Sequence, residues 1–224
     1  MPGGLTELIG KLPADLADNA FTHPSWAPDR ASSYERLEFL GDSVLELAVA
    51  RALYDQYPDL AEGKLAKIRS HVVSRASCAV VSRELQLGER LVEKGTGIVP
   101  DDELGRLSRN RNVLAALLEA ALAALFLKHG FAPIEAAIVE AFSGRIEYAA
   151  TTHVDYKTEL QEQLAALGRQ VSYSVLDVEG PPHDRKFTSA AVVDGDQAGV
   201  GVGASKKAAE QEAAKQALEK VRVA

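Results

Sequence analysis

Residues 32–47 of this 224-residue chain read SSYERLEFLGDSVLEL, and the stretch combines a helical pattern of apolar residues with a stripe of carboxylates. The apolar side chains recur at three- and four-residue spacing, which predicts an α-helix with one buried side. They are Leu37, Leu40, Val44, Leu47 and, further along, Leu53. Glu35, Glu38 and Asp42 have the same spacing, so the helix would place these carboxylates on one face.

Two interpretations of the carboxylates follow from the residues. Carboxylate oxygens are preferred ligands of Mg²⁺, so the stripe could be half of a magnesium site for phosphoryl-transfer chemistry. Alternatively, Ser32 and Glu35 form a capping box at the helix start, while Glu38 and Asp42 lie on a solvated edge. Spacing alone favours the second interpretation, since charged stripes are common on surface helices.

The helical texture extends from about residue 5 to 148. Further helical patterns cover 62–86, 111–129 and 133–148, and the stretches between them contain Gly, Pro and Asp, which interrupt helices. One of these stretches, GTGIVPDDELG at 95–105, is expected to hold Asp101, Asp102 and Glu103 in a loop. A string of helices without strands predicts an all-α bundle.

The pattern changes after residue 148. A predicted helix over 155–168 is followed by three short alternating segments that are typical of strands. An Ala-rich helix then begins after Ser205, which is well placed to cap it. The order α-β-β-β-α predicts a small α+β domain over 154–224, joined to a helical domain over 1–150 by a short linker near 149–154. Gly199, Gly201 and Gly203 indicate a tightly packed strand rather than a phosphate-binding loop.

Composition sets broader limits. The formal net charge of −7 argues weakly against nucleic-acid binding, although it does not exclude a local basic patch. The single cysteine, Cys78, excludes an internal disulfide framework and is expected in the core. The N-terminus lacks the pattern of a secretory signal, and the apolar run at 113–127 is too short for a membrane span and is interrupted by Glu119. These features predict a cytoplasmic protein.

Several segments together resemble the ribonuclease III family. ERLEFLGDSVL at 35–45 is similar to the family's signature motif, and FTHPSW at 21–26 is similar to its opening motif, where we expect His23 to be a packed or capping residue. EGKLAKIRSHVVS at 62–74 and RNVLAALLEAALAALFL at 111–127 resemble later motifs in the family's order. The C-terminal segment resembles a double-stranded-RNA-binding domain, so the resemblance covers about the whole chain.

The resemblance implies a homodimeric nuclease domain with Mg²⁺-dependent sites, in which Mn²⁺ can substitute. Each site would cut one strand of duplex RNA by water attack and leave 5′-phosphate and 3′-hydroxyl ends with short 3′ overhangs, as in the processing of rRNA and other precursors. Glu38, Asp42 and Glu119 correspond by position to metal ligands, and Asp42 and Glu119 to catalytic carboxylates. Glu35 and Glu62 correspond to supporting acidic positions.

Ala116 departs from the family pattern, which has an acidic or amide residue three places before the glutamate that corresponds to Glu119. Positions three apart share a helix face, and alanine cannot ligate a metal. Two readings follow. In one, Glu38, Asp42 and Glu119 hold the cation and water takes the remaining position. In the other, the protein binds duplex RNA without cutting it. The three retained carboxylates favour the first reading.

In the C-terminal domain, the resemblance assigns minor-groove contacts to two segments. They are Thr158, Gln161 and Glu162 of the first helix, and His183 of the loop GPPHDRKF at 180–187. Lys206 and Lys207 stand in the first turn of the last helix, whose N-terminus favours phosphate. Taken alone, such a lysine pair would be a solvated helix start, so its assignment to RNA also depends on the resemblance.

Overall fold

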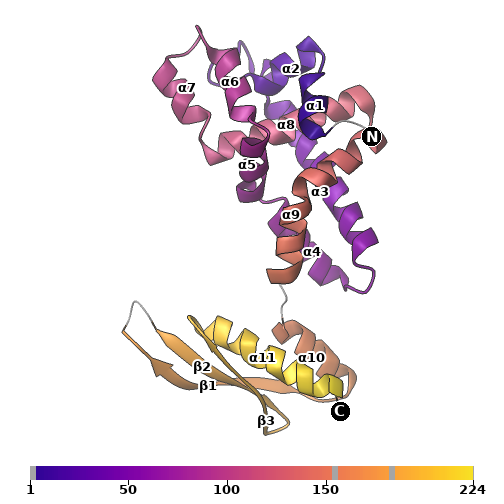
Figure 1. The fold of residues 1–224 in the computed structure, drawn as a ribbon, viewed down its shortest axis with the longest axis vertical. Coiled ribbons are helices and arrows are strands. Elements are labelled where there is room, and N and C mark those ends of the chain that lie inside the picture. Colours follow the sequence, from indigo (N-terminus) through magenta and orange to yellow (C-terminus); the bar gives the residue numbers. More distant parts are fainter. Residues whose placement is uncertain (1–3, 153–155, 182–184, 224) are drawn as a thin grey trace. The chain divides into compact units, whose positions relative to one another are not determined.

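The structure, a computed structural model, describes residues 4–152, 156–181 and 185–223 (Figure 1). The chain divides into two compact units, Met1–His153 and Val154–Ala224. The described part of the first unit is helical throughout. Its elements are α1 (Leu5–Gly10), α2 (Ala14–Phe21), the 3₁₀ helix η1 (Arg30–Ser32), α3 (Glu35–Gln56), α4 (Glu62–Val72), α5 (Arg75–Glu84), α6 (Leu87–Gly95), α7 (Asp101–Leu107), α8 (Arg111–His129) and α9 (Ala132–Thr152).

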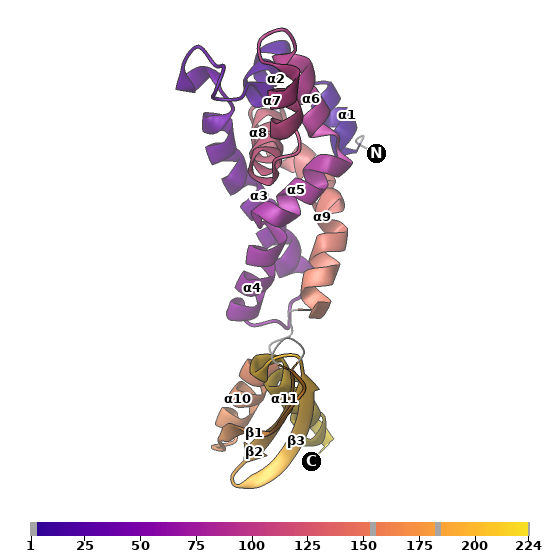
Figure 2. The same ribbon diagram turned by 90° about the vertical axis from the view of Figure 1, so that its left-hand side faces the viewer.

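Helix α8 is the centre of the first unit. Every residue from Val113 to Leu125 is buried, and the helix packs against α2, α3 and α5 (Figure 2). By length and composition α8 could cross a membrane, which corrects the expectation that this apolar run is too short. Its burial inside the bundle is that of a core helix, because the neighbouring helices cover its apolar side chains. The predicted all-α bundle is confirmed.

Three predicted boundaries in this unit are wrong. The segment 62–86 forms two helices, because the Ser74 hydroxyl accepts a hydrogen bond from the backbone N–H of Ser77 at 3.3 Å and caps a new helix. The expected loop at 95–105 contains most of α7, whose first turn holds three acidic residues that suit the positive end of the helix dipole. The expected linker at 149–154 is helical up to Thr152, where α9 ends.

The start of α3 also differs from the capping-box interpretation. Ser32 lies in η1, where its backbone N–H donates to the Asp29 carboxylate at 2.8 Å. Helix α3 begins at Glu35, and no side chain caps it. Its buried side is centred on small residues such as Gly41 and Ala48, which bring α8 close. Leu47 lies outside that side and is 53% exposed, against the sequence expectation.

The second unit contains α10 (Tyr156–Ala166), β1 (Val171–Glu179), β2 (Lys186–Val193), β3 (Asp196–Gly203) and α11 (Lys206–Val223). The strands form an antiparallel sheet in the order β1-β2-β3, with Tyr173 opposite Ala191 and Ala191 opposite Gly199. The core of this unit joins Leu160 and Leu164 of α10 to the sheet and α11. The predicted α-β-β-β-α order is confirmed.

The glycines of β3 allow α11 to approach the sheet closely. A Cβ atom on Gly201 would lie 2.2 Å from the Ala213 backbone nitrogen, and one on Gly199 would lie 2.2 Å from the Ala213 carbonyl oxygen. Contacts this short are not tolerated between non-bonded atoms. The prediction of a tightly packed strand is confirmed, and the helix backbone itself is what the strand packs against.

Candidate active site

Helices α3 and α8 touch backbone to backbone at Gly41 and Glu119. A Cβ atom on Gly41 would lie 1.7 Å from the Glu119 carbonyl oxygen, so only glycine permits this crossing. The crossing places Glu119 beside Glu38 and Asp42, which flank Gly41 on α3. Gly41 is not among the site residues predicted from the sequence. A glycine in the interior of a strongly helical pattern was the signal for a close packing contact.

Glu119 is the buried member of this carboxylate cluster. The residue is 4% exposed, and among the described residues its side chain has no hydrogen-bond or ion-pair partner. Burial, followed by the nearby charges of Glu38 and Asp42, raises the pKa of Glu119 to about 7, and Arg75 opposes the rise. The charges of Glu38 and Asp42 both act on Glu119, so the three carboxylates predicted as metal ligands lie near one another, and we refer to them as the carboxylate cluster. Glu38 is partly buried within it, and Asp42 is exposed.

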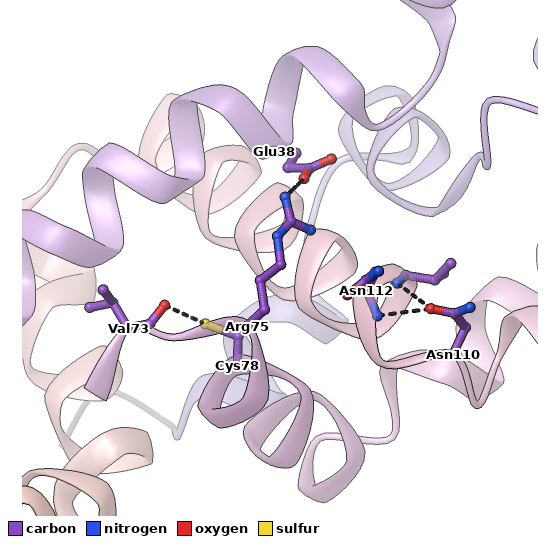
Figure 3. Close-up of polar contacts among 7 residues, drawn as sticks. Glu38, Val73, Arg75, Cys78, Asn110 and Asn112 are labelled. Carbon is purple, nitrogen blue, oxygen red and sulfur yellow. Dashed lines mark hydrogen bonds and ion pairs between the residues drawn. The ribbon is translucent and has the colours of Figure 1, made fainter. Parts of the chain in front are cut away.

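The chemistry of the cluster fits a hard divalent cation. Mg²⁺ prefers carboxylate oxygens, and an unpartnered buried carboxylate beside two others is stabilised by a positive charge. In the described part of the chain, no three His, Cys, Asp or Glu side chains stand in an arrangement that could hold a metal ion as they lie. Glu38 instead pairs with Arg75, whose Nη2 atom is 3.1 Å from its Oε1 atom (Figure 3). A cation would therefore have to draw Glu38 away from this pair.

Arg75 is the site residue that sequence reasoning missed. It is the first residue of α5, and a single helix over 62–86, as the sequence predicts, gives this position no helix start. Ser74, a preferred N-cap residue, was the available signal for a helix start at this point. Because α5 begins there, the arginine side chain reaches α3 from the helix end (Figure 3).

The two supporting acidic residues are less closely joined to the cluster. Glu35 is the first residue of α3, and Glu62 is the exposed first residue of α4. The charged groups that shift the pKa of Glu119 are Glu38, Asp42 and Arg75, and neither Glu35 nor Glu62 is among them. Glu62 lines a small hollow with Tyr54 and Arg69.

Position 116 supplies no ligand. Ala116 is 3% exposed and packs in the apolar core one turn before Glu119. At the start of the same helix the Asn110 side chain accepts from the backbone N–H of Asn112 at 2.8 Å, which fixes where α8 begins (Figure 3).

Cys78 is packed beside the cluster, and His23 is packed against the rings of Trp26 and Tyr34. Burial, followed by the charges of Glu119 and Asp42, raises the pKa of Cys78 to about 12, so its thiol stays protonated and contacts the Val73 carbonyl oxygen at 3.4 Å. The ring of His23 lies 5.2 Å from that of Trp26. Burial lowers the pKa of His23, although Glu103 and Glu35 oppose this. Both residues take the packing roles expected from the sequence.

The predicted RNA-binding residues lie on two helices of the second unit. Thr158, Gln161 and Glu162 are exposed on α10, and Lys206 and Lys207 are exposed in the first turn of α11. The Ser205 hydroxyl accepts from the backbone N–H of Ala208 at 3.2 Å, so the expected cap is present. His183 lies outside the described residues. An ion pair between Lys157 and Glu210 joins α10 to α11 and holds the two exposed surfaces in a fixed relation.

Comparison with known proteins identifies both units. A family model described as Ribonuclease-III-like matches residues 13–146. The chain belongs to the ribonuclease III family. A second model, the double-stranded RNA binding motif, matches residues 156–221. Ribonuclease 3 of Corynebacterium glutamicum is 42% identical over 214 residues, which cover 93% of this chain and 84% of that protein. Ribonuclease 3 of Streptococcus thermophilus is 38% identical and covers 92% of this chain and 91% of that protein.

Two solved structures are similar to this chain in fold. The nuclease domain of ribonuclease III from Campylobacter jejuni, described with a flexible region involved in dimer formation, matches with a TM-score of 0.54 and 29% identity. The match covers 63% of this chain and 95% of that one. Dicer from Pichia stipitis matches with a TM-score of 0.50 and 26% identity, over 92% of this chain and 93% of that one.

Proposed function

We propose that the chain is an endoribonuclease that hydrolyses double-stranded RNA with Mg²⁺, or Mn²⁺ in its place. The observation that carries the proposal is Glu119, a buried carboxylate without a partner in the described residues, which the α3–α8 crossing sets beside Glu38 and Asp42. The substrate class, double-stranded RNA, follows from the chain's membership of the ribonuclease III family and from its RNA-binding motif. We further propose that it works in the cytoplasm on rRNA and other precursors.

The cation and the carboxylates of the chain have different roles in the proposed reaction. When bound, the cation supplies Lewis-acid chemistry, which lowers the pKa of a water and neutralises charge on the phosphate. Glu38, Asp42 and Glu119 would hold the cation, and the exposed Asp42 carboxylate would accept a proton from the attacking water. The water oxygen bonds to phosphorus, the bond from phosphorus to the 3′ oxygen breaks, and that oxygen gains a proton from solvent. The products are a 5′-phosphate and a 3′-hydroxyl.

The alternative, a duplex-RNA-binding protein without cleavage, depends on Ala116. Ala116 is buried in the core and has no atom that could ligate a metal. The other three predicted ligands, Glu38, Asp42 and Glu119, still lie near one another. Mg²⁺ keeps several waters in protein sites, so one missing side chain does not prevent binding.

Cleavage of long duplex RNA tests the proposal directly. The purified chain with Mg²⁺ is expected to give short duplex products with 5′-phosphates and two-strand cuts offset by a short 3′ overhang. Asp42→Asn is the matched control, and it should stop cleavage while RNA binding measured in EDTA is retained. If the wild-type protein binds duplex RNA and yields no such products, the pseudo-enzyme alternative replaces this proposal.

Lys206→Ala with Lys207→Ala should weaken duplex-RNA binding about tenfold and reduce its salt dependence. Each lysine–phosphate contact contributes about one counterion to the slope of log affinity against log salt, so the double variant should lower the slope by about two. Fluorescence anisotropy at several salt concentrations measures both quantities. Lys220→Ala, an exposed lysine farther along α11, is the control. Equal losses in the control would show that the effect is only one of total charge.

We also propose that the nuclease unit forms a homodimer through the face around Phe39. This side chain is 81% exposed on α3 and stands beside a cavity of about 880 Å³. Leu37, Leu40 and the exposed Leu127 supply much of the apolar lining. A protruding aromatic ring next to an apolar hollow suits a two-fold interface, in which each ring enters the partner's hollow. The dimer formation described for the Campylobacter nuclease domain supports this choice of partner.

Phe39→Asp should convert the dimer to a monomer. Burying a carboxylate in an apolar hollow is unfavourable by several kcal/mol. Both protomers of a two-fold dimer carry the substitution, so the unfavourable free energy applies twice. Light scattering after size exclusion should give the mass of one chain for this variant and of two for the wild type. Ile98→Asp, at an exposed apolar residue between α6 and α7, should leave the dimer intact. A dimeric Phe39→Asp protein would place the interface elsewhere.

A further inference from the structure

Arg75 stands inside the carboxylate cluster and is open to solvent. Its Nη2 atom is 3.1 Å from Glu38 Oε1, and its side chain is 55% exposed against 21% for Glu38. Arginine carries five N–H donors in a planar fork, and among the residues that the structure describes this arginine has Glu38 as its single hydrogen-bonding partner. Because the arginine side chain is exposed, its donors can bind a second anion once Glu38 has been taken from it, without displacing α5 or α3.

The charge of Arg75 reaches beyond Glu38. It is the positive group among those that shift the pKa values of Glu119, Cys78 and Tyr34, and in each case it opposes the effect of the carboxylates. The arginine thus acts as a counter-charge for the whole cluster. Three carboxylates face one guanidinium, and Ala116 adds no charge.

A divalent cation and Arg75 compete for Glu38. A cation that takes the Glu38 oxygens releases the guanidinium at the solvent-facing edge of the same site. The substrate then brings a phosphodiester, whose two free oxygens match the arginine fork and whose charge the fork can neutralise. The exposed position of Arg75 at the end of α5 lets it pivot from one anion to the other.

We infer that Arg75 is a phosphate-binding residue of the active site: it holds Glu38 while no cation is bound, and it binds a phosphate of the duplex RNA once a cation has taken Glu38. The inference rests on the proposed function. It assigns the arginine two anions in turn, a protein carboxylate and then the RNA backbone.

Two binding measurements on the full chain test the inference without cleavage. Mn²⁺ affinity in the absence of RNA, measured by the electron paramagnetic resonance of free Mn²⁺, should increase about fivefold in Arg75→Ala, because the cation no longer competes with an exposed ion pair. Duplex-RNA affinity should fall about tenfold in the same variant when Ca²⁺ is present, because a charge-assisted phosphate contact is lost. In EDTA the RNA affinity should change less than twofold, since the arginine is then engaged with Glu38.

Two further variants separate this role from a structural one. Arg75→Lys retains the charge without the fork, so it should recover part of the RNA affinity in Ca²⁺. Arg51→Ala is the control. Arg51 has a similar side-chain exposure, 58%, and its Nη1 atom lies 3.0 Å from Glu135 Oε2, outside the carboxylate cluster. This variant should change neither the Mn²⁺ affinity nor the RNA affinity.

Unchanged or weaker Mn²⁺ binding by Arg75→Ala would overturn the inference, and so would an RNA-binding loss of equal size in EDTA and in Ca²⁺. A wild-type chain that binds no Mn²⁺ would overturn it together with the proposed function. A chain that fails to cut RNA but shows the expected shifts would retain the role of Arg75 and lose the proposed function.

Discussion

Glu119→Gln is expected to lower the cleavage rate about 10³-fold at saturating Mg²⁺. The substitution keeps the size of the side chain and removes a ligand charge, and a bound cation contributes several kcal/mol of transition-state stabilisation. Single-turnover cleavage of a short duplex measures the loss. The conservative control is Glu62→Gln, at an exposed residue that does not shift the pKa of Glu119, and it should cost far less.

The same substitution should stabilise the metal-free protein at high pH. The pKa of Glu119 is about 7 in the folded protein, against an ordinary value of 4.5. Between these values the folded protein binds a proton that the unfolded chain has released, so the free energy of unfolding falls as the pH rises from 4.5 through 7. The rise in pKa corresponds to about 3 kcal/mol. Glutamine carries no charge and removes this loss.

Unfolding in EDTA at pH 5 and pH 8 measures this effect. The nuclease-unit transition of the wild-type protein should be less stable at pH 8 than that of Glu119→Gln, and the two should be similar at pH 5. If the variant shows the same pH dependence as the wild type, the ionisation of Glu119 is not what destabilises the site.

Gly41→Ala is expected to destabilise the nuclease unit by at least about 3 kcal/mol, because the new methyl group would overlap the Glu119 backbone. A helix carbonyl cannot rotate away, so α3 and α8 must separate. The separation also moves Glu38 and Asp42 from Glu119, and a displacement of about 1 Å in a catalytic group can cost about 10²-fold in rate. Denaturant unfolding and cleavage of the remaining folded protein measure the two effects.

Gly144→Ala provides the matched control for this prediction. Gly144 lies in α9 with no atom within 4 Å of its would-be Cβ. Alanine in a helix interior is favoured over glycine by about 0.5–1 kcal/mol, so the same substitution should stabilise the protein here. If both variants behave alike, the crossing at Gly41 does not depend on the missing side chain.

The sequence was most informative where a pattern is local. The spacing of apolar residues predicts the helix at 111–129 with the bounds of α8, because helix formation depends on neighbours three and four residues apart. It was less informative at short breaks. Helix α4 ends at Val72, the Ser74 hydroxyl caps the start of α5, and no change in apolar periodicity marks this break.

In the candidate site, too, the sequence identified individual residues but not the contacts between helices. The carboxylates on α3 and Glu119 on α8 could be named from the residues and the family resemblance. Their contact through Gly41 could not, since it joins positions 41 and 119 across two helices. The Arg75–Glu38 pair spans 37 positions and depends on where α5 begins. Neither separation leaves a periodic trace in the chain.

The sequence by itself therefore determined the helical character of the first unit, the α-β-β-β-α order of the second and the residue types suited to metal and RNA. Only the tertiary structure decided that Glu119 is buried without a partner among the described residues, that Gly41 sets its distance from the α3 carboxylates, and that Arg75 opposes their charge. The physical reason is that burial, electrostatic coupling and close backbone contact depend on which helices meet, whereas helix formation depends chiefly on residues within one turn.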